Sequence, residues 1–453
     1  MQLYPDQQDM IGELRAAFQQ FKNVLLVSPT GSGKTVCFSY LANSIAKRGK
    51  SVYILVHREE LMDQVSASLT SFGVEHGFVA SGRPSTYKPV MVCSVFTLVN
   101  RMQDYPLPDM LILDEAHHAS QGSTWSRILA HFATCYVLGV TATPIRLDGK
   151  PLRGHFAHMV LGLSVADLIA RERLSDYVLY CPPIAIAKMR MRMGDFNRED
   201  MKNAMDKPSI TGNAVDHYLK RGAGKRAVAF CVSLDHAAAV ALEFEARGVK
   251  AARIDGGMDR KERKGLIAAF SRGDIKVLTS CDLISEGFDI PAIEVAILLR
   301  PTASLSLYLQ QVGRALRRHP GKTHAIILDH AGNAGRHGYP DEVHEWSLGE
   351  EATGKAKKKA GEMSVRTCGG CYAAARSGTM ICPYCKWEWP IEAREVQAEE
   401  GELEEVALAE RQAAIKKRQE QGMAKTLPEL MTLAKERGYK PGWAWKIFNR
   451  RHA

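Results

Sequence analysis

The sequence contains no run of 18 consecutive apolar residues, so we expect no membrane-spanning helix and no function that needs one. Its first residues lack the basic and apolar parts of a secretory signal peptide, which favours a cytoplasmic protein. The sequence has fewer acidic than basic residues: it contains 50 Asp and Glu and 60 Lys and Arg, which gives a net charge of +10. This excess predicts a polyanionic partner, most simply nucleic acid, although a basic protein without such a partner stays an alternative.

The cysteines show no sign of a secreted disulfide framework. Most of the ten are scattered through apolar runs, as expected for reduced thiols buried in a cytosolic protein. These scattered cysteines are Cys37, Cys93, Cys135, Cys181, Cys231 and Cys281. The other four lie close together near the C-terminal end and need a separate explanation.

Short apolar runs alternate with amphipathic stretches in two blocks of the sequence. The first block has runs at 24–27, 52–56, 90–93, 111–113 and 136–140, and the second has runs at 227–232, 277–278, 295–299 and 325–328. Parallel sheets covered by helices on both faces have this pattern. We therefore expect an α/β fold with two parallel-sheet domains.

A glycine-rich turn joins a predicted strand, 23–27, to a predicted helix, 36–47. Such a turn points backbone N–H groups at phosphate oxygens, and the helix N-terminus adds the positive end of its dipole. Lys34 supplies a charge for the β- and γ-phosphates of ATP, and Thr35 supplies a hydroxyl for Mg²⁺. The backbone of the cradle comes from Thr30, Gly31, Ser32 and Gly33, whereas Ser28 stands where the usual pattern has Gly.

Two adjacent carboxylates, Asp114 and Glu115, follow the fourth apolar run of the first block, 111–113. The carboxyl ends of parallel strands meet at one edge of a sheet, so these side chains are expected near the Lys34 loop. Asp114 can hold the Mg²⁺ shell, and Glu115 can orient and deprotonate an attacking water.

Asp114 to His117 spell the DEAH box, and the chain resembles superfamily 2 helicases over about residues 1–335. The closest resemblance is to bacterial RadD-like DNA repair helicases and to helicases of phages and prophages, which favours a bacterial cytoplasm, or a host cytoplasm if the chain is phage-encoded. The other segments that carry the resemblance are 3–8, 57–61, 93–97, 141–144, 230–233, 279–291 and 310–317.

The resemblance implies two RecA-like domains with ATP in the cleft between them. The expected division is 1–170 for the first domain, 171–225 for a connector, 226–345 for the second domain, 346–365 for a basic linker, 366–390 for a zinc ribbon, and 391–453 for a charged helix and tail.

Further nucleotide contacts are implied by the same resemblance. Gln7 resembles the glutamine that reads adenine, but Tyr4 stands where the family has Arg, and Asp6 where it has an aromatic residue. Arg314 and Arg317 are expected to share one face of a helix and to reach the γ-phosphate from the second domain, as arginine fingers. The remaining implied contacts to nucleotide or cleft are Gly287, Asp289 and Gln310.

Nucleic acid is expected to lie across both domains. The contacts implied by motif position are Arg58, Ser94, Thr97 and Thr279. Hydroxyl and guanidinium groups can hold phosphates without reading bases, which suits a translocase. For each hydroxyl, a helix or turn cap is an equally good reading.

Two C-x₂-C pairs lie ten residues apart and form the second strong motif: Cys368, Cys371, Cys382 and Cys385. Four thiolates at this spacing predict one tetrahedral Zn²⁺ with a structural role, because a closed shell leaves no site for substrate. Disulfides, which a cytosol disfavours, and iron are the alternatives. The ribbon would bind DNA or another protein.

The last segment, 439–451, interleaves aromatic and cationic residues, which suits either nucleic-acid contact or packing of a C-terminal helix. Together these features predict an ATP-dependent DNA helicase or translocase in replication, recombination or repair, with replication or repair proteins as further partners. An RNA helicase is one alternative. The other is an interaction protein that uses ATP as a switch and recruits partners through the ribbon.

Overall fold

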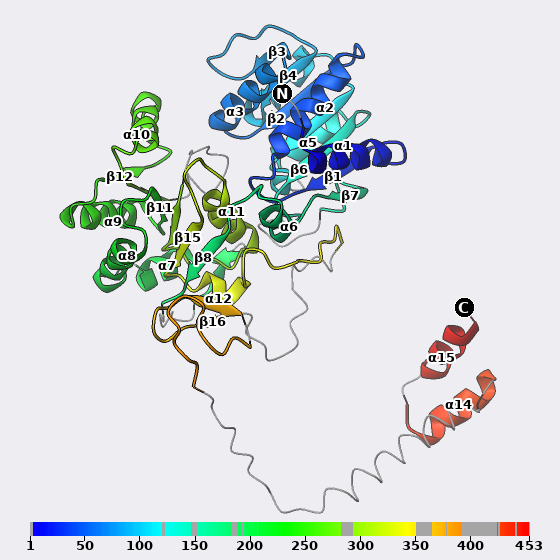
Figure 1. Ribbon diagram of the computed structural model, residues 1–453. Helices are drawn as coiled ribbons and strands as arrows, with labels where there is room; N and C mark the ends of the chain where they lie inside the picture. The colour runs from blue at the N-terminus through cyan, green and yellow to red at the C-terminus, as the bar shows by residue number, and fades with distance from the viewer. Residues whose placement is uncertain are drawn as a thin grey trace, which may run out of the picture. The chain divides into compact units, whose positions relative to one another are not determined.

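The computed structural model describes residues 3–119, 123–145, 152–182, 189–192, 194–205, 207–281, 293–349, 365–376, 378–390, 424, 426–439 and 442–452. The chain forms two compact units, Met1–Trp389 and Pro390–Ala453. Within the first unit lie two parallel sheets, drawn in Figure 1 with the first mainly in blue and cyan and the second in green and yellow. Within the described residues, every helix is too short or too polar to cross a lipid bilayer.

The first sheet has the strand order β3-β4-β2-β5-β6-β1-β7, and all of its paired strands are parallel. Its strands are β1 (Asn23–Val27), β2 (Val52–Val56), β3 (His76–Val79), β4 (Val90–Ser94), β5 (Met110–Asp114), β6 (Tyr136–Thr141) and β7 (His158–Leu161). The α-helices are α1 (Pro5–Ala17), α2 (Lys34–Ala46), α3 (Glu59–Ser71), α4 (Val95–Leu98), α5 (Thr124–His131) and α6 (Val165–Ala170), with short 3₁₀ turns at Met102–Asp104 and Ala116–His118.

Both faces of this sheet are buried, which explains why its strands read as continuous apolar runs. Val24 and Leu26 belong to one core cluster, and Leu25 and Val27 belong to the cluster on the opposite face. Successive strand residues point to opposite faces, so a strand covered on both sides needs apolar side chains at every position. The expected α/β fold is confirmed.

The second sheet has the order β12-β13-β11-β14-β15-β8, again with parallel pairs. Its strands are β8 (Tyr177–Tyr180), β11 (Ala227–Phe230), β12 (Ala251–Ile254), β13 (Val277–Ser280), β14 (Val295–Leu298) and β15 (Ala325–Asp329). The helices are α7 (Arg198–Met205), α8 (Pro208–Arg221), α9 (Leu234–Ala246), α10 (Arg260–Arg272), α11 (Leu305–Leu316) and α12 (Asn333–His337). A small antiparallel pair, β9 (Met191–Arg192) and β10 (Asp195–Phe196), lies between β8 and α7 in the sequence.

The structure corrects two expected domain bounds. The segment 171–225 is more than a connector, because β8 pairs with β15 as an edge strand of the second sheet and α8 packs against α9. The linker expected from residue 346 is ordered at its start: Trp346 and Leu348 pack against the core of the first block, and the Arg153 N–H donates to the Leu348 carbonyl at 3.0 Å. Apolar contacts hold both segments, and charge patterning alone did not reveal them.

A small hairpin carries the first two of the four clustered cysteines, Cys368 and Cys371: β16 (Val365–Thr367) pairs antiparallel with β17 (Ala374–Arg376). Val365 and Ala374 belong to the core cluster of the second block, and Tyr180 at the end of β8 forms a bridge with Ala373. The hairpin therefore packs against the end of β8, the edge strand of the second sheet.

The second unit contains two helices, α14 (Leu427–Glu436) and α15 (Trp443–His452). Leu430 is fully buried between them, with Trp443, Ile447 and Phe448 packed against it. The aromatic residues at 443 and 448 thus serve this local core, whereas Trp445 stays 53% exposed.

Candidate nucleotide site, nucleic-acid face and metal centre

The phosphate loop connects β1 to α2 through two glycines in the left-handed region, Gly31 with φ 87° and Gly33 with φ 88°. A side chain at Gly33 would also collide with Gln7, whose Nε2 would lie 2.3 Å from the added Cβ. These two positions therefore need glycine for conformation and for space. At the position where the usual pattern has Gly, the Ser28 hydroxyl donates to Ser32 Oγ at 2.8 Å, so the substitution is accommodated inside the loop.

Lys34 is the first residue of α2, and its ammonium group lies within the loop. Its Nζ donates to the carbonyl of Ser28 at 2.8 Å and to that of Pro29 at 2.9 Å. Burial lowers the pKa of Lys34, and the nearby carboxylates of Glu115 and Asp114 oppose that shift. A triphosphate in the loop would replace the two carbonyl acceptors with charged oxygens.

Asp114 ends β5 and Glu115 follows with φ 51°, a left-handed conformation that is strained for a residue other than glycine. Burial, with the neighbouring Glu115 charge, raises the pKa of Asp114 to about 7. His117 joins this pair to β6: its Nδ1 lies 3.4 Å from Glu115 Oε2 and 3.0 Å from Thr141 Oγ1. The strained turn thus holds two carboxylates side by side, which suits one for Mg²⁺ and the other for proton transfer.

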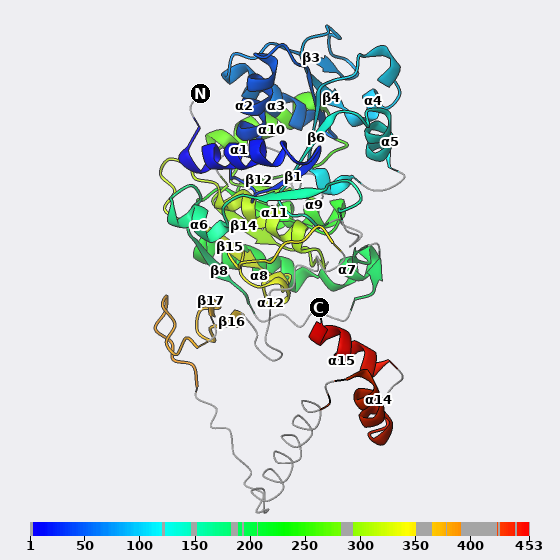
Figure 2. The same ribbon diagram turned by 90° about the vertical axis from the view of Figure 1, so that its right-hand side faces the viewer.

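Helix α11 of the second block lies against the phosphate loop, and both views show it next to the first block (Figures 1 and 2). A Cβ at Gly313 would lie only 2.8 Å from Thr30 Cβ, so glycine permits this approach. The Thr143 hydroxyl donates to Ser306 Oγ at 2.6 Å in a buried hydrogen bond between the two blocks. The cleft between the blocks is therefore tightly packed at this point.

The two candidate arginine fingers come from the end of α11. Arg314 is buried within the helix, and the charges of Arg317 and Arg314 help to lower the pKa of Lys34, which puts both near the phosphate loop. Arg314 lies in the last turn of α11, and Arg317 is the residue that caps the C-terminal end of this helix after Leu316. Its side chain lies beside Gly31, where an added Cβ would meet Arg317 Cγ at 3.5 Å.

The structure describes only some of the other predicted nucleotide contacts. Gln7 is buried beside the loop: its Oε1 accepts the Tyr4 N–H at 3.1 Å, and its Nε2 donates to the Ser32 carbonyl at 3.3 Å. Gln310 is buried on α11. Gly287 and Asp289 lie outside the described residues.

The structure divides the predicted nucleic-acid contacts into two groups. Arg58 precedes α3, and Ser94 and Thr97 flank the start of the short α4, all three partly accessible to solvent. Thr279 is not accessible: it is fully buried in β13, and its hydroxyl donates to the Ala237 carbonyl at 2.7 Å. Its predicted phosphate contact is therefore wrong in this conformation, because the motif position did not reveal which way the hydroxyl points.

Sequence reasoning missed two features of this face. Phe96, between Ser94 and Thr97, is 63% exposed and presents a ring on which a base could stack. Helix α10 also forms ion pairs with α3 across the two blocks, Arg263 with Glu60 at 2.6 Å and Arg260 with Asp63 at 3.0 Å. The basic run at the start of α10 was visible in the sequence, but its partners were not.

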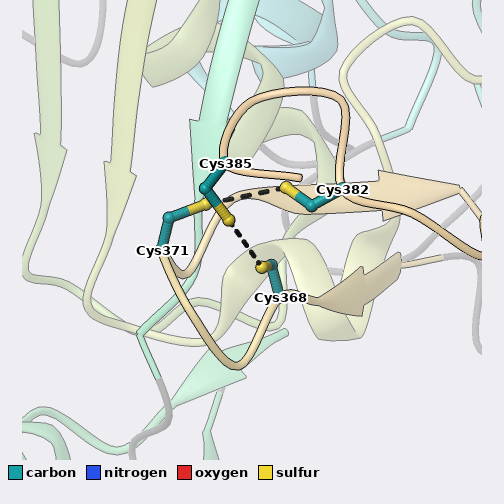
Figure 3. A group of neighbouring side chains, drawn as sticks. All are labelled: Cys368, Cys371, Cys382 and Cys385. Carbon is teal, nitrogen blue, oxygen red and sulfur yellow. Dashed lines mark hydrogen bonds between the residues drawn. The ribbon is translucent and has the colours of Figure 1, made fainter. Parts of the chain in front are cut away.

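The four clustered cysteines form a candidate metal centre, shown in Figure 3. Their sulfur atoms all lie within 4.8 Å of one another, with Cys368 and Cys385 at 3.5 Å and Cys371 and Cys382 at 3.7 Å. A disulfide would need about 2 Å, whereas four thiolates around one Zn²⁺ have sulfur atoms about 3.7 Å apart. The geometry therefore fits zinc, and the four cysteines form no disulfide in this structure.

The metal centre is attached to the second block by backbone hydrogen bonds. The Cys181 N–H donates to the Tyr372 carbonyl at 2.8 Å, and Arg221 Nη2 donates to the Cys371 carbonyl at 3.1 Å. The Arg221 guanidinium also lies 4.8 Å from the Tyr180 ring centroid. The turn that contains Cys371 and Tyr372 is thus attached directly to the end of β8 and to α8.

Two family models match the chain. Residues 1–146 match the family described as type III restriction enzyme, res subunit, and residues 211–319 match the helicase conserved C-terminal domain. These matches contain the phosphate loop, the carboxylate pair and both candidate arginine fingers.

Two curated proteins show how far the similarity extends. The chain is 35% identical over 382 residues to a 51.5 kDa protein of a Lactococcus phage (isolate 7-9), covering 84% of this chain and 81% of that protein. It is 30% identical over 354 residues to IRC3 of Saccharomyces cerevisiae, which is named as an ATP-dependent helicase, covering 72% of this chain and 51% of the yeast protein. The chain thus spans most of the phage protein and about half of the yeast one.

Three solved structures share the fold. A fragment described as an HsdR subunit of a type I restriction enzyme from Vibrio vulnificus YJ016 has a TM-score of 0.58 at 21% identity, over 74% of this chain and 66% of that chain. The type ISP restriction-modification enzyme LlaBIII bound to DNA has a TM-score of 0.54 at 16% identity, over 72% of this chain and 28% of that chain. Dbp5 of S. cerevisiae bound to RNA and ADP BeF3 has a TM-score of 0.51 at 16% identity, over 72% of this chain and 87% of that chain. At these identities the similarity shows the fold alone.

Replacing Glu115 with Gln is expected to leave nucleotide binding intact and to lower the ATP turnover number by about 100-fold or more, because an amide cannot accept the proton of the attacking water. Turnover and binding of a fluorescent nucleotide are measured on the same preparation. Lys34→Ala is the comparison, since it should lose binding as well as turnover. Turnover by Glu115→Gln within about tenfold of the unsubstituted chain would remove Glu115 from this role.

Replacing Arg317 with Ala is expected to lower the ATP turnover number by about 1,000-fold while changing nucleotide affinity by less than about tenfold, because its contact strengthens in the transition state. Arg318→Ala is the matched control, since Arg318 is the next residue but forms an exposed ion pair with Glu172 at 3.1 Å. An equal loss of turnover and affinity in Arg317→Ala would limit Arg317 to ground-state binding.

Replacing Cys382 with Ser is expected to remove the one Zn²⁺ per chain and to lower the unfolding midpoint of the protein by roughly 5 °C, because the ribbon shares the core of the second block. Metal analysis and thermal unfolding test this directly. Cys135→Ser is the control, since Cys135 is a buried thiol of the first block. An unchanged unfolding midpoint in a zinc-free Cys382→Ser protein would mean that the ribbon contributes nothing to the second block.

Proposed function

The chain belongs to the superfamily 2 helicases and is an ATP-hydrolysing enzyme, and we propose that it is a DNA helicase or translocase acting in replication, recombination or repair. In this proposal ATP and Mg²⁺ bind between the two blocks, and hydrolysis changes how the blocks pack at the phosphate loop. Zn²⁺ is the structural ion of the ribbon.

The observation that carries the proposal is the packing of α11 onto the phosphate loop. Gly313 lies against Thr30, and Arg317 lies beside Gly31, so the second block touches the loop that receives the triphosphate. Loss of the γ-phosphate would remove charge from this contact and loosen the junction between the blocks. Such loosening would move the second block relative to the nucleic-acid face of the first block.

The proposed nucleic-acid contacts in the first block are Arg58, Ser94 and Thr97, with Phe96 as a base-stacking residue. Guanidinium and hydroxyl groups can bind phosphates of any sequence, and an exposed aromatic ring can stack on any base. The net charge of +10 supports a polyanionic partner of this kind.

DNA is favoured over RNA by the match of residues 1–146 to a restriction-enzyme family. An RNA substrate is the second candidate, because the fold is shared with a protein bound to RNA. An interaction role is the third, supported by exposed apolar side chains of the ribbon: Met380, Ile381 and Tyr384. The phage relative supports a bacterial cytoplasm as the place of action.

ATP hydrolysis measured with single-stranded DNA, duplex DNA and RNA of equal length is expected to show about tenfold or greater stimulation by DNA, falling steeply as salt is raised. Arg58→Ala should raise the DNA concentration needed for half-maximal stimulation several-fold, and Arg101→Ala, on an exposed ion pair with Asp104, is the control. Stronger stimulation by RNA would replace the DNA proposal. No stimulation by any nucleic acid would favour the interaction role.

A further inference from the structure

The carbonyl groups at the C-terminal end of α11 are held by groups from outside the helix. The helix ends at Leu316, and its capping residue, Arg317, has φ −60° and ψ 136°, so the chain leaves the helix in an extended conformation. The last carbonyls of a helix have no partner within it, and they carry the negative end of the helix dipole. Their partners must therefore come from elsewhere in the fold.

Lys322 supplies the donor for two of the carbonyls at this end. Its Nζ donates to the Arg317 carbonyl at 2.9 Å and also to the Ala315 carbonyl. The same Nζ donates to the Ile293 carbonyl at 3.0 Å, just before β14. One ammonium group thus ties Arg317 to the end of its own helix and to the neighbouring strand.

A tight turn brings Lys322 back to the end of the helix. The Lys322 N–H donates to the His319 carbonyl at 3.0 Å, and Gly321 between them has φ 82°. Pro320 and Gly321 are the residue types that a type II turn favours at its two central positions. The chain therefore reverses within residues 319–322, which explains how a side chain that follows the helix reaches carbonyls of its last turn.

The ammonium group of Lys322 keeps its proton near neutral pH. Burial lowers the pKa of Lys322 to about 8, the charge of Glu294 opposes that shift, and the charge of Lys225 adds to it. Below this pKa the ammonium group has one N–H donor for each of the three carbonyls. A cation is also favoured at the C-terminus of a helix. The position therefore uses both the charge and the full hydrogen-bonding capacity of the group.

A second segment, just before β8, also fixes the backbone at Arg317. Leu174 forms an antiparallel bridge with Arg317, and the Ser175 N–H donates to the Leu316 carbonyl at 2.8 Å. Leu174 and the Arg317 side chain both approach Gly31 of the phosphate loop. The backbone of Arg317 is thus held by this segment and by Lys322, while its side chain lies at the loop.

We propose that Lys322 is a positioning residue of the ATPase, which fixes the backbone of Arg317 so that its guanidinium group reaches the phosphates of ATP. Lys322 acts through the helix end, because its Nζ contacts backbone carbonyls. Displacing a catalytic group by about 1 Å can lower a rate by about 100-fold, so a small shift of Arg317 is sufficient for a large effect. The proposal rests on Arg317 being an arginine finger, and Arg317→Ala tests that role by itself.

Lys322→Met removes the ammonium group and keeps most of the side-chain volume. It is expected to lower the ATP turnover number by about 10- to 100-fold. The affinity for ADP should change by less than about twofold, because the contact of Arg317 strengthens only in the transition state. Turnover is measured on the full chain without nucleic acid and is divided by the number of nucleotide-binding sites in the same preparation.

This measurement separates positioning from stability. A purely structural role would lower the unfolding midpoint and the fraction of protein that binds nucleotide, but it would leave the turnover per binding site unchanged. Lys250→Met is the matched control, since Lys250 is an exposed lysine of the second block and should leave all these values unchanged.

The double variant Lys322→Met/Arg317→Ala shows whether the lysine acts through the arginine. The double variant should turn over ATP within about twofold of Arg317→Ala alone, because losses at residues that act as one unit are not additive. A further loss of about tenfold or more in the double variant would mean that Lys322 acts independently of Arg317, and this would overturn the proposal.

Two other results would also overturn it. One is an unchanged turnover number in Lys322→Met. The other is an unchanged turnover number in Arg317→Ala, which would leave no arginine finger to position. That second result would not bear on the choice between DNA and RNA, because these assays contain no nucleic acid. If Lys322→Met does not fold, Lys322→Gln decides: its amide keeps a donor but not the charge, so it should show the same selective loss of turnover.

Discussion

The close approach of α11 to the phosphate loop is the constraint on which the arrangement of the two blocks depends. There is no room for a Cβ between Gly313 and Thr30, so the helix and the loop are in direct van der Waals contact. The buried hydrogen bond from Thr143 to Ser306 lies on the same junction. A close-packed interface of this kind has few stable states between the fully packed one and the one in which its two sides have separated. A nucleotide at the loop therefore acts on a junction that responds by discrete rearrangement.

The charges in the cleft follow from this packing. Lys34, Arg314 and Arg317 bring three cations to a site that also holds the carboxylates of Asp114 and Glu115. Burial lowers the pKa of Lys34, and it raises the pKa of Asp114 to about 7. Both shifts show that the cleft disfavours charge when it contains only protein groups. A magnesium–triphosphate complex supplies anionic oxygens for the cations and a metal for the carboxylate, so binding relieves this cost.

The sequence predicted the parts of the fold that depend on local pattern. Strands buried on both faces, the phosphate loop and the four-cysteine cluster all have signatures in consecutive residues, and the structure contains each of them. It did not predict features set by tertiary contact. Thr279 has the motif position of a phosphate ligand, but it is buried in the core. The strand β8 was missed because it is a short edge strand whose partner, β15, is far along the chain.

The segment between α6 and β8 shows why such tertiary contacts matter for the mechanism. Arg173 Nη1 donates to Asp6 Oδ1 of α1, Leu174 approaches Gly31 of the phosphate loop, and the Ser175 N–H donates to the Leu316 carbonyl at 2.8 Å, next to Arg317. Three consecutive residues thus connect α1, the phosphate loop and the end of α11. The chain then continues into β8, whose end holds the metal ribbon through the Cys181 N–H. Because a strand within a sheet moves as a rigid element, any shift of this segment on nucleotide binding is carried to the second sheet and to the ribbon together. The ribbon is therefore attached to the second sheet through the end of β8.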